Sequence, residues 1–371
     1  MRRAQATAVI AVLLLAGCSP APDATTGTPS APAGTPSGTS TSATGPQTLG
    51  RPATVVDGLD APWSLAALPG GGFLVSQRDD GRILEVGPTG SAREAGTVPG
   101  VVHVGEGGLN GIALWTGDGG TWLYAYHATA ADNRVVRMRL TGGAGLYGLS
   151  APQPVLTGIR AASTHNGGRL AFGPDGMLYI TTGDAQHSDD AQDRDSLNGK
   201  ILRVTPEGDP APGNPFGNAV YSYGHRNVQG IAWTPDGTMW ATEFGQNTWD
   251  ELNVIVPGGD YGWPVVEGRA GDPRYRDPLL QWPTDQASPS GLAAVGDTLY
   301  LACLRGARVW QVRTAGAQVV GDAVAQLTGF GRIRDVAPDG NGGLWVLTNN
   351  TDGRGSPRPG DDRVLRVTVN G

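Results

Sequence analysis

His165 is the residue whose type and position best suit acid–base chemistry. It lies in Thr164-His-Asn-Gly-Gly-Arg, directly before alternating apolar residues that are typical of a strand. An imidazole titrates near neutral pH, so a histidine at the mouth of a strand can take a proton from a hydroxyl group. The alternative is a loop histidine that only bonds a backbone carbonyl.

Arginines recur at equivalent places in later segments. Arg226 and Asn227 lie in Gly-His-Arg-Asn before another strand-like run, and they offer several N–H donors to carbonyl or carboxylate groups. Arg332 and Arg334 point to the same side of an extended segment, where two cations favour a bound anion. Arg305 lies in a loop one unit earlier. Each could instead bond loop carbonyls or face solvent.

Residues 243–253, Glu-Phe-Gly-Gln-Asn-Thr-Trp-Asp-Glu-Leu-Asn, are rich in carboxylates and amides. Hard cations such as Ca²⁺ prefer carboxylate and carbonyl oxygens, so this loop is a candidate calcium site, although its spacing is not that of an EF-hand. The alternative is a turn-rich loop without metal. The sequence has no Gly-x-Ser-x-Gly elbow and no zinc motif, and the glycine-rich run 105–111 lacks the strand–helix context of a nucleotide site.

Six repeated turn-and-strand units would position these residues. Each unit opens on Pro-Asp-Gly or a related turn and continues as an alternating strand; the turns begin near residues 68, 117, 173, 234, 295 and 338. A period of about 53 residues is typical of propeller blades. We therefore predict an all-β fold, a six-bladed β-propeller of four-stranded antiparallel blades, whose functional loops between blades gather at one face.

Composition favours this fold and excludes several classes of protein. The 371 residues include 59 glycines and 28 prolines, which is too many for a protein of long helices. A net charge of −7 argues against a nucleic-acid partner, because phosphate binding needs a basic surface. Lys200 is the only lysine, so a cation used in chemistry must be an arginine or a metal.

The first 50 residues predict export and attachment to a membrane. Residues 1–18 carry two arginines, a short apolar stretch and Leu-Ala-Gly-Cys, which resembles a bacterial lipobox ending at Cys18; an ordinary signal peptide is the alternative. Residues 19–50 are almost wholly small or polar and predict a disordered linker. We expect a propeller over 51–371, held at the outer face of the bacterial cytoplasmic membrane through the lipid anchor only.

Several motifs in order resemble the soluble glucose and aldose sugar dehydrogenases that use pyrroloquinoline quinone (PQQ), a glucose/sorbosone dehydrogenase-like family. The most specific are His165-x-Gly-Gly-Arg with Gly-Pro-Asp-Gly, Leu197-x-Gly-Lys-Ile-Leu-Arg, Gly-His-Arg-Asn, and Asp250-Glu-Leu-Asn followed by Gly-Gly-Asp-Tyr-Gly-Trp-Pro264. The resemblance covers residues from about 58 to 369. It implies a six-bladed propeller that oxidises the C1 hydroxyl of an aldose sugar to a lactone with PQQ and Ca²⁺, and passes electrons to an unknown acceptor.

The resemblance also implies roles for single residues. His165 matches the base that takes the sugar's proton, and Arg226 matches the arginine beside the quinone carbonyl. Cofactor contacts are implied for five residues: Glu106, Asn227, Arg305, Arg332 and Arg334. Two of these depart from frequent choices of the family, because Glu106 replaces a glutamine and Arg305 replaces a lysine.

Two calcium sites are implied in the same way. Gly245 and Gln246 match main-chain carbonyls that hold the cofactor's calcium, and Glu251 with the carbonyl of Tyr261 matches a second, structural site. Short loops favour an open site with broad sugar tolerance. The rival interpretation is a non-catalytic cell-surface propeller that binds sugar or peptide; a lactonase-like hydrolase would need a more carboxylate-rich channel.

Overall fold

A computed structural model describes residues 47–117 and 119–371, so the expected anchor Cys18 and most of the expected linker lie outside these ranges. The described chain is built from strands, and its one helical element is a single 3-10 turn, η1 (Ser188–Ala191). No helix in this part of the chain has the length and hydropathy of a membrane span.

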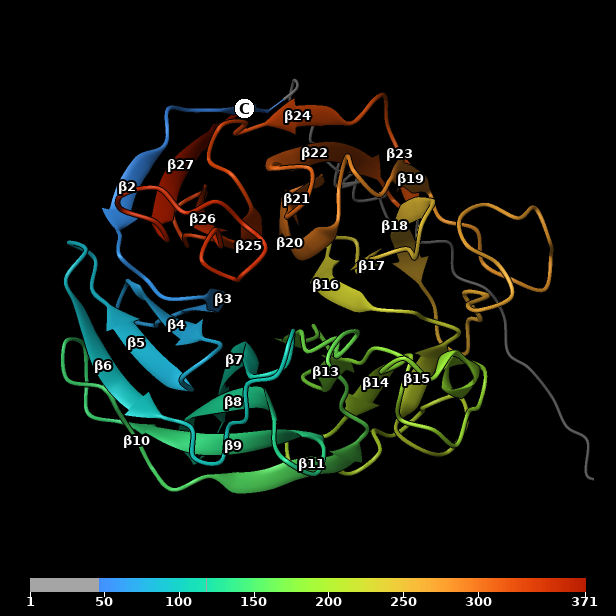
Figure 1. Ribbon diagram of the computed structural model, residues 1–371, viewed down its shortest axis with the longest axis horizontal. Coiled ribbons are helices and arrows are strands. Elements are labelled where there is room, and N and C mark those ends of the chain that lie inside the picture. Colours follow the sequence, from blue (N-terminus) through green and yellow to red (C-terminus); the bar gives the residue numbers. More distant parts are fainter. Residues whose placement is uncertain (1–46, 118) are drawn as a thin grey trace, which may run out of the picture. The chain divides into compact units, whose positions relative to one another are not determined.

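Six antiparallel sheets within the unit Thr44–Gly371 lie side by side around a common centre (Figure 1). The strands of each blade are given from the inside outward. The first blade contains β3 (Pro62–Ala67), β4 (Phe73–Gln77), β5 (Arg82–Val86) and β6 (Ala92–Thr97), and the second contains β7 (Leu109–Gly117), β8 (Gly120–Ala128) and β9 (Asn133–Thr141) with β10 (Gly148–Leu149) and β11 (Gln153–Ile159). The third blade contains β12 (Leu170–Phe172), β13 (Leu178–Thr181), β14 (Lys200–Val204) and β15 (Val220–Tyr223). The predicted six-bladed propeller is confirmed.

The other three blades complete the ring. The fourth blade contains β16 (Val228–Trp233), β17 (Met239–Glu243), β18 (Trp249–Ile255) and β19 (Leu280–Pro283). The fifth contains β20 (Pro289–Val295), β21 (Thr298–Cys303) and β22 (Arg308–Ala315) with β23 (Gln318–Val319) and β24 (Val324–Gln326). The sixth contains β25 (Ile333–Pro338), β26 (Gly343–Thr348) and β27 (Val364–Asn370) with β1 (Thr48–Leu49) and β2 (Ala53–Val56). In three blades, two short strands share the fourth place.

The two ends of the propeller meet in the last blade. Both β1 and β2, from the start of the described chain, pair antiparallel with β27 at its end. This pairing closes the ring, because it holds the chain segment that precedes the first blade within the sheet of the last blade. It also begins at Thr48, within the last residues of the segment expected to be linker.

The six turns found in the sequence join the first and second strands of the six blades. In the clearest case, Gly176 N–H donates to the carbonyl of Gly173 at 2.9 Å, and Oδ1 of Asp175 accepts from Met177 N–H at 3.1 Å. The aspartate therefore stabilises the turn with its own side chain, which is the local chemistry expected of Pro-Asp-Gly.

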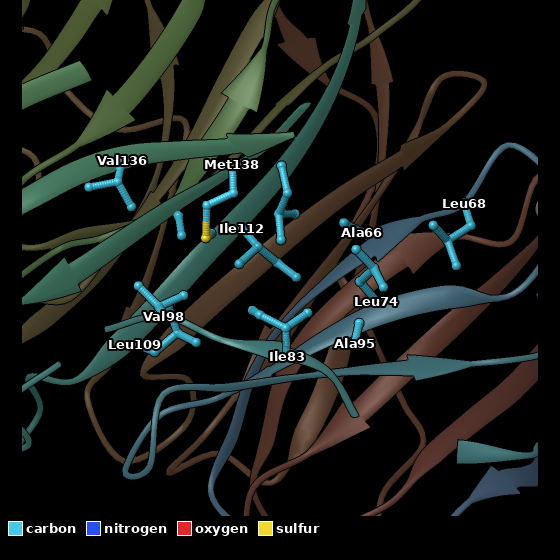
Figure 2. Close-up of a cluster of buried hydrophobic side chains, with 12 residues drawn as sticks. Ala66, Leu68, Leu74, Ile83, Ala95, Val98, Leu109, Ile112, Val136 and Met138 are labelled. Atoms are coloured by element: carbon cyan, nitrogen blue, oxygen red, sulfur yellow. The ribbon is translucent and has the colours of Figure 1, made fainter. Parts of the chain in front are cut away.

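Hydrophobic clusters fill the space between neighbouring blades. Figure 2 shows one of them, in which Leu74 and Ile83 of the first blade face Leu109, Ile112 and Met138 of the second. All five are at most 2% exposed, and burying such a side chain contributes roughly 1.5–3 kcal/mol. The clusters fix each blade against the next, so loops at one edge of the ring are held on a rigid base.

Two kinds of loop reach the edge that carries the candidate residues. One precedes the innermost strand of a blade, as do the loops with His165 and Arg226; the other joins the second and third strands, as do those with Gly245 and Arg305. The expectation that the function sits on loops between blades is thus incomplete. First and third strands of an antiparallel sheet run the same way, so the loops before both lie at one edge.

Candidate functional site

A cavity of about 450 Å³ lies among these loops and gathers most of the residues expected at a site. Nine of the eleven candidates within the propeller line it: Glu106, His165, Arg226, Asn227, Gly245, Gln246, Arg305, Arg332 and Arg334. Six arginines and three carboxylates face the cavity, so guanidinium groups outnumber carboxylates by three. A chain of net charge −7 thus carries a locally cationic pocket.

His165 is held in an unusual backbone conformation at the wall of this cavity. Its φ of 59° is in the left-handed region, which costs a non-glycine residue of order 1 kcal/mol or more. Its N–H donates to Oε2 of Glu106 at 3.1 Å, and its carbonyl accepts from Ala185 N–H at 3.1 Å. A Cβ on Gly183 would overlap this carbonyl, so only glycine lets the two loops approach. The conformation is enforced by its surroundings.

The two ring nitrogens of His165 have different partners. Nδ1 lies 2.8 Å from Oδ1 of Asp184, and Nε2 lies 2.8 Å from a terminal nitrogen of Arg226. A guanidinium only donates, so Nε2 must be the acceptor, and Nδ1 carries the proton and donates to Asp184. The side chain is 20% exposed, so Nε2 belongs to a reachable base.

Asp184, which was not predicted from the sequence, orients His165 through the hydrogen bond to Nδ1. Its carboxylate also accepts from Trp263 Nε1 at 2.8 Å and from Gln186 N–H at 2.9 Å. Burial works against its charge, but the hydrogen bond and charge interaction with His165, together with these bonds, keep the pKa of Asp184 below its ordinary value. An ionised Asp184 is therefore available to stabilise a protonated His165.

Arg226 and Asn227 leave donors unused at the cavity. Arg226 donates to the Phe244 carbonyl at 3.1 Å, and burial lowers its pKa. Asn227 is fully buried, and its oxygen accepts from Gly167 N–H at 2.9 Å. Within the described residues, Nε of Arg226 and Nδ2 of Asn227 are buried without a hydrogen-bond partner. Buried donors of this kind favour a bound group with acceptor oxygens.

Arg332 and Arg334 converge as expected, and Asp352 lies between them. Its Oδ2 accepts from Nε and a terminal nitrogen of Arg332 at 3.0 and 2.8 Å, and from Arg334 at 3.4 Å. Burial opposes the charge of Asp352, but the two arginines hold its pKa below the ordinary value. Arg334 also donates to Oε1 of Gln229 at 3.0 Å, and its Nε is buried without a partner among the described residues. One carboxylate thus serves two cations, which leaves positive charge in excess.

Glu106 and Arg305 lie toward the open side of the cavity. Glu106 forms an ion pair of 2.8 Å with Arg354, whose side chain is 57% exposed, so the pair faces solvent. Arg305 is exposed and lines both this cavity and an adjoining surface hollow. Arg305 thus contributes charge near the entrance, whereas the Glu106 carboxylate connects the exposed Arg354 with the backbone N–H of His165.

Glu251 and Tyr261 lie outside the large cavity, in a small one of about 10 Å³ that also contacts Glu243, Gly245 and Glu267. Glu243 and Glu251 are directly opposite each other on β17 and β18, and both are buried. Burial first, and then the charge of Glu243, raise the pKa of Glu251 to about 8. A space for one small ion beside opposed carboxylates has the donor chemistry of a hard-cation site.

No group of three or more acidic, histidine or cysteine side chains forms a metal cage in the described part of the chain. Among the residues described, side chains of these types therefore do not form a cage of three ligands near Gly245 and Gln246. Both residues line the large cavity.

Several residues of the site were not identified as site residues from the sequence. Arg78, Asp184 and Asp352 each follow the second strand of a blade, a loop type that the sequence analysis did not weigh as a group. Trp263 and Glu267 arrive from the long connection between β18 and β19. Listing the polar residues after every second strand would have found the first three.

Comparisons with known proteins agree with this geometry. The sequence model of the Glucose / Sorbosone dehydrogenase family matches residues 59–357. The PQQ-bound aldose sugar dehydrogenase of Streptomyces coelicolor is 51% identical, with a TM-score of 0.84 over 88% of this chain and 99% of that one.

Two curated relatives are more distant. The aldose sugar dehydrogenase of Escherichia coli is 31% identical over 350 residues, covering 81% of this chain and 92% of its own length. The quinoprotein glucose dehydrogenase B of Acinetobacter calcoaceticus is 33% identical over 257 residues, which cover 60% of this chain and 54% of that protein.

Proposed function

The chain belongs to the glucose/sorbosone dehydrogenase family, and on this premise we propose that it is a PQQ- and calcium-dependent aldose sugar dehydrogenase. The reaction is oxidation of the C1 hydroxyl of an aldose to a lactone. The observation that carries the proposal is the pairing of a base, His165, with unpartnered buried donors in one cationic cavity.

The cavity fits PQQ by its charge and by its donors. PQQ carries three carboxylates and quinone oxygens, and here guanidinium groups exceed carboxylates by three. Three of the six buried donors without partners among the described residues are on residues that line this cavity, Arg226, Asn227 and Arg334. An acceptor-rich polyanion would satisfy them, because an unpaired buried donor costs about 1–3 kcal/mol. We propose that these three residues, with Arg332 and Arg305, hold the cofactor.

When bound, PQQ would accept the hydride that leaves C1 of the sugar. His165 would take the proton of the C1 hydroxyl on Nε2, while its Nδ1–H stays on the Asp184 carboxylate. Nε2 has a single lone pair, which accepts from Arg226 in this structure, so the guanidinium must turn away from the ring before Nε2 can take the proton. The guanidinium is then free to stabilise negative charge elsewhere in the cavity.

We propose that calcium binds at two places. The carbonyls of Gly245 and Gln246 would hold one ion at the cavity, where it supplies Lewis acidity beside the cofactor. Glu251 and the carbonyl of Tyr261 would hold a second ion in the small cavity, where it stabilises the loop. The second site is supported by the opposed glutamates, which need a positive charge to ionise together.

The substrate range and the location of the enzyme are also proposals. Open hollows adjoin the cavity on both sides, which favours a site that accepts mono- and disaccharides. The lipobox-like segment ending at Cys18 supports export and lipid anchoring at the outer face of the cytoplasmic membrane.

Reconstitution tests the proposed activity. Metal-free, cofactor-free protein is mixed with PQQ and Ca²⁺, and sugar-dependent reduction of an artificial acceptor dye is followed over a panel of mono- and disaccharides. We expect turnover only when both additions are present, with several sugars accepted. Binding of sugar without any dye reduction would favour the non-catalytic propeller, and strict preference for one sugar would contradict an open site.

A further inference from the structure

Glu267 occupies a nest of backbone N–H groups beside the proposed cofactor calcium site. Its Oε1 accepts from four consecutive amides, at distances of 2.8, 3.1, 2.9 and 3.0 Å: those of Gln246, Asn247, Thr248 and Trp249. Consecutive N–H groups that point into one concavity are a typical anion-binding arrangement. Here the anion comes from the chain itself.

The direction of these amides fixes the direction of two carbonyls. The peptide bonds Gly245–Gln246 and Gln246–Asn247 are trans, so each N–H and the carbonyl of the same peptide point in opposite directions. Since the N–H groups of Gln246 and Asn247 point at Glu267, the carbonyls of Gly245 and Gln246 point away from it. Glu267 does not line the large cavity, whereas Gly245 and Gln246 do. The two carbonyls therefore lie on the side of the loop opposite Glu267, and both residues that carry them line the cavity.

Gly245 makes this close approach possible. A Cβ at this position would lie 2.7 Å from Oε1 of Glu267 and would overlap the carbonyl of Trp249. Partial burial opposes the charge of Glu267, but the four backbone hydrogen bonds hold its pKa below the ordinary value. The carboxylate is therefore ionised at neutral pH and can accept all four hydrogen bonds from the loop.

We propose that Glu267 is the positioning residue that aims the carbonyls of Gly245 and Gln246 at the calcium of the cofactor site. This inference rests on the proposed function for the calcium itself, but the nest and its geometry belong to the protein without ligands. The next residue, Gly268, donates its N–H to Oε1 of Glu251 at 2.8 Å. One short segment therefore touches both proposed calcium sites.

The test compares Glu267→Gln with wild-type protein. Glutamine has the same shape and keeps one oxygen, but a neutral oxygen holds amides less firmly than a carboxylate. We expect the amides of residues 246–249 to exchange hydrogen at least about tenfold faster in the metal-free variant. The calcium concentration needed for half-maximal PQQ binding, read from the absorbance of the bound cofactor, should rise about 10- to 100-fold.

Two further variants make the result specific. Glu207→Gln removes the same charge from a side chain that is 60% exposed on another blade, and it should leave both readouts unchanged. Glu267→Asp keeps the charge but shortens the reach by one methylene, and it should resemble Glu267→Gln rather than wild type. A charge effect without positioning would instead leave Glu267→Asp like wild type, which contradicts the proposal.

The remaining outcomes separate this inference from the proposed function. If wild type binds PQQ with no need for calcium, both the calcium site and its positioning by Glu267 are wrong. If wild type needs calcium and Glu267→Gln changes neither the exchange rates nor the calcium concentration, only the inference fails. A changed KM for sugar with an unchanged calcium requirement would make Glu267 a sugar contact, which also overturns it.

Discussion

The large cavity and the small cavity beside it carry opposite charges that the protein does not fully neutralise, and we call them the cationic side and the acidic side. The cationic side comes from the first and last blades and consists of Arg78, Arg332, Arg334 and Arg354. The acidic side comes from the fourth blade and its long connection and consists of Glu243, Glu251 and Glu267.

The two sides handle their excess charge differently. On the cationic side, Asp352 alone serves Arg332 and Arg334. On the acidic side, Glu243 opposes Glu251, whose pKa rises to about 8. One side therefore favours an added anion and the other an added cation, and a polyanion that chelates a divalent cation would satisfy both.

The largest expected effect comes from His165, which lines the large cavity. In His165→Ala, the base is lost while both charged sides stay intact, so kcat should fall about 10²- to 10⁴-fold with little change in PQQ binding. Dye-linked kinetics and absorbance titration measure the two quantities. His187→Ala, an exposed histidine in the adjacent loop, is the control and should retain activity. Loss of PQQ binding in His165→Ala would place the histidine on the cofactor-binding surface.

Removing a positive charge from the cationic side should weaken cofactor binding and have little effect on turnover. Arg334→Met removes charge-assisted hydrogen bonds from a buried position, so the Kd for PQQ should rise roughly 10- to 100-fold. Turnover at saturating PQQ should remain measurable. Arg51→Met removes an exposed arginine and should leave the Kd as in wild type. Equal Kd values for all three proteins would show that this side does not bind the cofactor.

The acidic side predicts a pH-dependent stability of the metal-free protein. Glu251 has a folded pKa of about 8 against an ordinary value of 4.5, so between these values the folded chain binds a proton that the unfolded chain releases. Stability then falls as pH rises through this window, by on the order of 5 °C in Tm. Saturating Ca²⁺ or Glu251→Gln should flatten the dependence. The same slope in Glu251→Gln, measured by thermal unfolding, would assign it to another group.

The smallest effect is expected for Glu106, near the entrance of the large cavity. Glu106→Gln removes a carboxylate from the cationic pocket, so PQQ affinity should rise about two- to fivefold. The gain is small because the ion pair with Arg354 faces solvent. Raising ionic strength should erase most of the gain, since exposed charges are screened. A lower affinity in titration would instead mean that Glu106 itself contacts the cofactor.

The fold could be predicted because its signals are local. Each Pro-Asp-Gly or related turn bonds its own residues, as Asp175 does with Met177, and the strand that follows alternates visibly. Loops at strand mouths then follow from the repeat, which is how His165, Arg226, Arg332 and Arg334 were found. The family resemblance added Gly245 and Gln246, whose relevant atoms are in the main chain and leave no trace in side-chain chemistry.

The partners of these residues could not be predicted, because they come from distant parts of the chain. Trp263 reaches Asp184 across 79 positions, and Glu267 reaches Gln246 across 21. Asp352 reaches Arg332 across 20 positions, and its role depends on the turn of the last blade. No periodicity marks such contacts.

The sequence by itself determined the number of blades, their turn-and-strand units and the loops that carry arginine, histidine and glutamate, since turns and alternation depend on neighbouring residues. Only the tertiary structure decided which charges pair and which stay unpaired. That choice depends on distances between blades, and the energy of a buried charge is set by whatever segment the fold brings beside it.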